Sequence, residues 1–96
     1  MVRGVDLAIY ADALAGEAAS LAARAERARS RLRQAAIEKR ARHELTAVAV
    51  ERLEALGILG SVDEAATRAE LRELEAAIDA VEELQPWLEG ELASAA

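Results

Sequence analysis

The sequence predicts an all-α protein: an antiparallel helical hairpin with coiled-coil-like packing, which assembles further into a helical bundle. Three observations support this. The composition is rich in Ala, Glu, Arg and Leu, with a single Pro, which is typical of long helices. Apolar residues recur at alternating spacings of three and four along two stretches of chain. Between these stretches, one short segment carries both a helix-ending and a helix-starting signal.

The first helix is predicted over residues 5–56, which contain no proline and only Gly16 as an interior glycine. A glycine there lowers helix propensity by about 1 kcal/mol, so the helix is expected to pass through or bend slightly. A heptad seam of apolar and small residues runs through Leu7, Ala11, Leu14, Ala18, Leu21, Ala25, Ala28, Leu32 and Ala35. Beyond it the pattern shifts phase, and the expected continuation is Ile37, Ala41, Leu45, Val48, Arg52 and Leu56.

The turn is predicted at residues 57–61. Gly57 follows the last periodic leucine, and glycine readily takes the left-handed conformation that ends a helix. Ile58 is expected to contact the last helical turn. Ser61 and Glu64 have the spacing of a capping box, in which each side chain accepts a hydrogen bond from the other residue's backbone N–H.

The second helix is predicted over residues 62–85, followed by a short C-terminal helix over 86–93. Its seam runs through Leu71, Leu74, Ile78, Val81, Gln85, Leu88 and Leu92. Pro86 removes one helix hydrogen bond and disfavours helical geometry at the residue before it. The sequence therefore predicts a kink or break near Pro86.

Charge is unevenly distributed along a chain whose net charge is −6. Residues 24–42 hold eight basic and two acidic residues, whereas residues 57–96 hold ten acidic and two basic ones. Arg24, Arg27 and Arg31 flank the seam as residues at e and g positions do in coiled coils. Folding the arms together is expected to bring acids such as Asp79 near Lys39, so ion pairing within the hairpin or between chains is predicted.

A homodimer, or a higher even oligomer, is also predicted. The second arm is too short to cover the start of the first, which leaves an apolar stripe that long helices normally bury. The expected oligomer interface is Leu7, Tyr10, Leu14 and Leu21. Two interpretations of Trp87 and Leu88 stay open. They either cap the end of the bundle or form an anchor for another protein, because tryptophan is enriched at interface hot spots.

No catalytic, cofactor or metal site is predicted. His43 is the only histidine, is expected on a helix surface, and lacks the glutamate three residues earlier that a di-iron bundle uses. No glycine-rich phosphate loop or membrane-length apolar run is present, and residues 1–12 are not expected to act as a signal peptide, because Asp6 and Asp12 interrupt their apolar pattern. The favoured hypothesis is a cytoplasmic, non-enzymatic scaffold or adaptor in protein–protein assembly.

The alternative hypothesis is a nucleic-acid-associated protein that uses the basic stretch 24–42. Arg24, Arg27 and Arg31 would contact phosphates. The acidic net charge, and the lack of any aromatic residue between Tyr10 and Trp87 on which bases could stack, favour the scaffold hypothesis.

Overall fold

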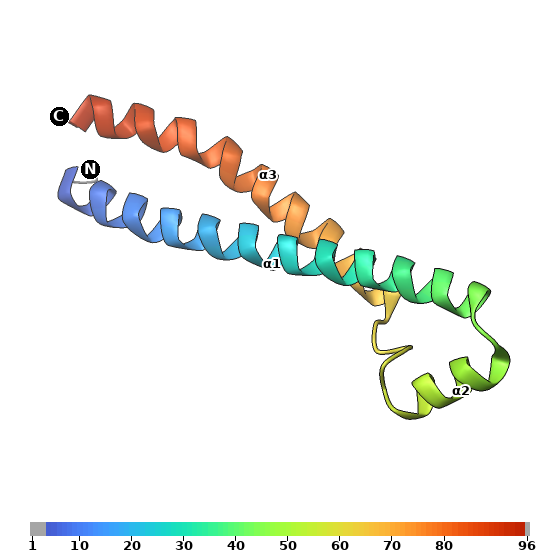
Figure 1. Ribbon diagram of the computed structural model, residues 1–96. Coiled ribbons are helices and arrows are strands. Elements are labelled where there is room, and N and C mark those ends of the chain that lie inside the picture. Colours follow the sequence, from blue (N-terminus) through green and yellow to red (C-terminus); the bar gives the residue numbers. More distant parts are fainter. Residues whose placement is uncertain (1–3, 96) are drawn as a thin grey trace. The chain divides into compact units, whose positions relative to one another are not determined.

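The computed structural model describes residues 4–95, which form three α-helices and no strand (Figure 1). The helices are α1 (Gly4–Glu44), α2 (Ala47–Ala55) and α3 (Glu64–Ala95). The predicted all-α class and helical hairpin are confirmed, with α1 and α3 as the two arms. Coiled-coil and bundle assembly stay predictions. The described chain divides into two compact units: unit 1 holds residues 4–25 and 73–95, and unit 2 holds residues 26–72.

In unit 1, the start of α1 lies beside the end of α3 (Figure 1). A Cβ atom added to Gly4 would lie 3.8 Å from the Cβ of Ala95. Leu7 and Leu88 are buried, and the seam residues between them on each helix are half-buried or buried. Within unit 1, both predicted heptad seams are therefore confirmed as the faces of α1 and α3 that are shielded from solvent.

The predicted break at Pro86 is wrong, because α3 continues through it to Ala95. A proline inside a helix removes one hydrogen bond and clashes with the preceding turn. Beyond it, however, Leu88 is only 3% exposed and Leu92 is half-buried. Burial of these side chains within unit 1 offsets the local cost, as tertiary packing often overrides propensity.

In unit 2, the seam of α1 continues through the buried Ala28 and Ala35, but not as predicted beyond them. The next covered positions are Glu38, which is buried, and Ala41, which is half-buried. The other members of the expected continuation are exposed: Ile37, Leu45, Val48, Arg52 and Leu56. The buried position is held by the charged Glu38. A prediction from hydrophobicity alone therefore selected the adjacent apolar residue, Ile37.

The predicted single helix over 5–56 is also wrong, since α1 ends at Glu44 and α2 begins at Ala47. Thr46 lies between them in an extended conformation, with φ −67° and ψ 152°. Its hydroxyl accepts a hydrogen bond from the backbone N–H of Ala49 at 3.2 Å. This is an N-cap, which satisfies one of the unpaired donors at the start of a helix.

The turn after α2 confirms the left-handed Gly57, whose φ is 73°. The N–H of Ile58 donates to the carbonyl of Leu53 at 2.9 Å, and the N–H of Gly57 donates to that of Glu54 at 3.0 Å. These two bonds define a Schellman motif. The apolar contact expected of Ile58 stays a prediction, since Ile58 is exposed; the next residue, Leu59, is buried.

The start of α3 corrects the predicted capping box. Asp63 is the cap, since its carboxylate accepts from the N–H of Ala66 at 3.0 Å. Glu64 instead pairs with Arg68 at 2.6 Å. Residues 45–63, which include α2, separate α1 from α3, so the connection is longer than the predicted turn. The predicted approach of Asp79 to Lys39 stays a prediction, because the two residues belong to different units.

Candidate functional site

Glu38 holds the connection between α2 and α3 against α1. Its side chain accepts hydrogen bonds from Nε2 of Gln34 at 3.2 Å, from Oγ of Ser61 at 3.4 Å and from the backbone N–H of Gly60 at 3.4 Å. Gln34 also donates to Oγ of Ser61 at 3.2 Å. Burial of a carboxylate is costly unless it is hydrogen-bonded, and these donors supply that compensation. The network is a structural latch.

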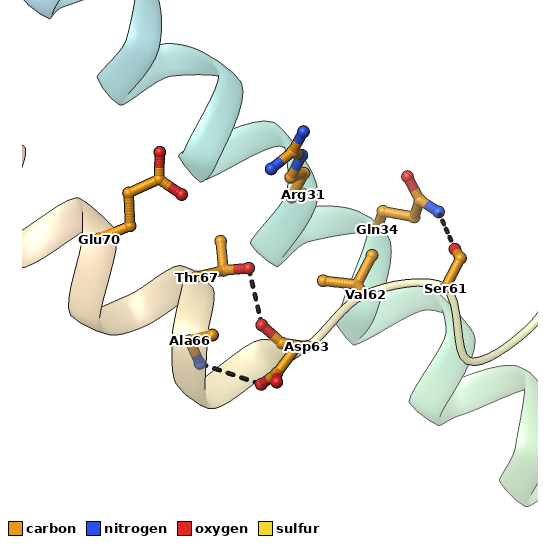
Figure 2. Close-up of a pocket in the computed structure, with 8 residues that line it drawn as sticks. All are labelled: Arg31, Gln34, Ser61, Val62, Asp63, Ala66, Thr67 and Glu70. Atoms are coloured by element: carbon orange, nitrogen blue, oxygen red, sulfur yellow. Dashed lines mark hydrogen bonds between the residues drawn. The ribbon is translucent and has the colours of Figure 1, made fainter.

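An open pocket of about 430 Å³ lies beside this latch, within unit 2 (Figure 2). Figure 2 shows Arg31 and Gln34 on α1 facing the start of α3 across it. The lining is mixed in charge and polarity: Arg31, Gln34, Ser61, Val62, Asp63, Ala66, Thr67 and Glu70.

The polar groups of the pocket are largely engaged in local hydrogen bonds. Ser61 bonds to the latch, and the hydroxyl of Thr67 donates to the carbonyl of Asp63 at 2.7 Å. Arg31 shares the pocket with two carboxylates, those of Asp63 and Glu70. An anionic ligand would meet their repulsion, so the pocket is poorly suited to phosphate.

Residues 4–95 contain no group of three His, Cys, Asp or Glu side chains that could hold a metal ion. His43 lies in the last turn of α1 and is exposed. Within the same residues, no helix is both long and apolar enough to cross a membrane.

Exposed apolar side chains are the most distinctive surface feature. Among the described residues the buried large apolar side chains are four leucines, Leu7, Leu59, Leu74 and Leu88, whereas nine large apolar side chains are exposed. Those in unit 1 are Val5, Ile9, Tyr10 and Trp87; those in unit 2 are Ile37, Leu45, Val48, Leu56 and Ile58. None of the residues of α2 is buried. Where such side chains form a contiguous patch they mark interaction sites, so these residues are the candidates for one.

The residues of the predicted oligomer interface fall into two groups, those covered within unit 1 and those exposed. Leu7 is buried within unit 1, and Leu14 and Leu21 are half-buried there, while Tyr10 is exposed. The premise that this stripe lacks a partner in its own chain is wrong, because α3 extends to Ala95. The predicted partner anchor divides in the same way: Trp87 is 58% exposed and Leu88 is buried.

The three arginines of the nucleic-acid hypothesis are exposed along α1: Arg24, Arg27 and Arg31. None of them makes an ion pair with another described residue. Other arginines pair locally, as Arg33 does with Glu26 at 2.7 Å and Arg42 with Glu54 at 3.5 Å. The hydrogen bond and positive charge of Arg33 lower the pKa of Glu26 below its ordinary value of 4.5.

Sequence reasoning missed the latch and the separate helix α2. The available signals were weak: Glu38 stands three residues after Ala35, a spacing that keeps a residue on the seam. Thr46 precedes the apolar run Ala47–Val50, which is where an N-cap residue is favoured.

Comparison with known proteins identifies no relative: no family model, curated protein or solved structure matches this chain.

Proposed function

We propose that this protein is a non-enzymatic, self-associating helical module that scaffolds other proteins in the cytoplasm. The observation that carries the proposal is the excess of exposed over buried large apolar side chains. Scattered exposed apolar residues are ordinary on a protein surface. Here, however, no residue of α2 is buried. Val48 within α2 is exposed, and so are Leu45, Leu56 and Ile58 in the segments on either side of it.

The small core supports self-association. The buried apolar side chains of the described residues are four leucines and three alanines. A core of this kind contributes little stability, which oligomerisation commonly supplements in chains of this size.

Nucleic-acid association by Arg24, Arg27 and Arg31 is the competing proposal. The exposure of these arginines without ion pairs favours nucleic-acid association. The carboxylates of Asp63 and Glu70, which share a pocket with Arg31, and the net charge of −6 disfavour it. If the protein is a scaffold, a gel-shift assay at physiological salt should show only weak, unspecific binding to duplex DNA or RNA. Tight, strongly salt-dependent binding that is lost on changing these arginines to Gln would favour nucleic-acid association over scaffolding.

Sedimentation equilibrium of the full chain tests self-association. We expect a dimer or higher even oligomer at micromolar concentration. Substituting Gln for Val48 and Leu56 should weaken association while circular dichroism stays unchanged, because neither side chain is buried. Substituting Gln for Ala23, which is exposed on α1 but small, is the matched control and should have little effect. A fully helical wild-type monomer at all concentrations would contradict self-association.

A further inference from the structure

We propose that a face of unit 1 in one copy of the chain docks on a face of unit 2 in a second copy, and that the second copy returns the contact. The first is the acidic tryptophan face: Glu83, Trp87 and Glu91. The second is the basic isoleucine face: Arg33, Ile37 and Arg40. The inference rests on the proposed self-association and specifies two faces that meet, in addition to the apolar side chains exposed around α2.

The two units carry opposite net charges. Residues 1–25 and 73–96 contain ten acidic and two basic residues, a net charge of −8. Residues 26–72 contain ten basic and eight acidic residues, a net charge of +2. Contact between unlike units is therefore favoured, and contact between two copies of unit 1 is opposed by strong repulsion.

The acidic tryptophan face is a single surface of α3. Glu83 and Glu91 lie four residues before and after Trp87, and residues at that spacing are neighbours on a helix. All three side chains are exposed. Neither glutamate makes an ion pair or hydrogen bond with another described residue through its side chain. The face is thus an apolar anchor between two uncompensated carboxylates.

The basic isoleucine face has the same layout on α1, with opposite charge. Arg33 lies four residues before Ile37 and Arg40 three residues after it. Ile37 is 70% exposed. Arg33 pairs with Glu26 and Arg40 with Glu44, but these pairs are exposed and such pairs contribute little. Each guanidinium has five donors, so it can bind a carboxylate of a second copy as well.

The two faces together have the usual composition of a protein–protein interface. Trp87 and Ile37 supply an apolar centre, and the charged residues on both sides supply a polar rim. Tryptophan and arginine are the residue types most enriched at hot spots. With two-fold symmetry the same contact forms twice, as expected of a closed dimer. Docking two tryptophan faces together would instead bring four carboxylates into contact.

Charge reversal tests the assignment. Wild type, Glu83→Lys with Glu91→Lys, Arg33→Glu with Arg40→Glu, and the chain carrying all four changes would be compared by sedimentation equilibrium, with helicity checked by circular dichroism. Each pair alone should raise the dimer dissociation constant by about tenfold, since symmetry applies every reversal twice. The chain with all four changes should return near the wild-type value.

Two further readouts use the wild-type chain. Its dissociation constant should rise between low salt and 1 M salt, where the Debye length falls to about 3 Å. Trp87 is the only tryptophan, so its fluorescence should shift to shorter wavelength as the dimer forms.

The outcomes separate this inference from the broader proposal. A dimer that tightens on changing Glu83 and Glu91 to Lys would show like-with-like contact and overturn reciprocal docking. So would a dimer insensitive to all four changes, although self-association would survive. A monomer at every concentration would overturn both.

Discussion

Glu38 shows how one residue can decide a local structure. Glu38 is only 6% exposed, and its carboxylate accepts hydrogen bonds from α1 and from the loop before α3. Loops have few packing contacts of their own. A network of hydrogen bonds can therefore determine where the loop before α3 lies against α1. Leu59, buried just before Gly60, adds an apolar contact to the same segment.

Replacing Glu38 with Ala should lower the free energy of unfolding by about 1–3 kcal/mol, because the hydrogen bonds from Gln34, Gly60 and Ser61 to its carboxylate are lost. Urea unfolding at one protein concentration would measure this. Glu51→Ala is the matched control: Glu51 is exposed on α2, so its removal should change stability by no more than about 0.5 kcal/mol. Equal effects of the two substitutions would exclude a latch role for Glu38.

At the scale of the helix, α3 shows packing prevailing over local preference. Pro86 lies in its interior, 22 residues from its start at Glu64, although a proline there costs about 3 kcal/mol relative to alanine. The residues on either side belong to one heptad seam, with Gln85 half-buried and Leu88 buried. Ending the helix before Pro86 would expose Leu88 and Leu92.

Pro86→Ala should therefore stabilise the protein, by up to about 3 kcal/mol, with a higher midpoint of thermal unfolding. The side chain at position 86 is exposed, so the substitution removes no packing. The comparison is Leu88→Ala, which removes a buried side chain and should destabilise by about 2–5 kcal/mol. A loss of stability in Pro86→Ala would mean that the proline ring itself supports unit 1.

At the scale of the whole molecule, stability and assembly are expected to be linked. The core of the described residues consists of four leucines and three alanines, and alanine buries little area. Association that binds only the folded chain stabilises it by mass action.

The midpoint of thermal unfolding should consequently rise with protein concentration. Calorimetry over a hundredfold range of protein concentration would measure this rise. If the residues around α2 contribute to self-association, Leu56→Gln should make the midpoint less dependent on concentration. Leu14 and Leu21 are unsuitable probes, since they are half-buried within unit 1 and their substitution would damage the hairpin directly. A midpoint independent of concentration would show that the single chain supplies all the stability.

The sequence by itself determined the helical class, both heptad seams and the left-handed Gly57. These follow from local rules: periodicity selects the covered face, and only glycine takes a positive φ without strain. The tertiary structure decided the rest. Glu38 became a seam residue because Gly60 and Ser61 reach it, and α3 passes Pro86 because Leu88 is buried beyond it. The candidate surfaces likewise depended on the three-dimensional fold, since Ile37 and Trp87 are exposed only because the covered faces of their helices are filled by other residues. Contacts between residues distant in sequence decide these features, and local patterns signal them only weakly.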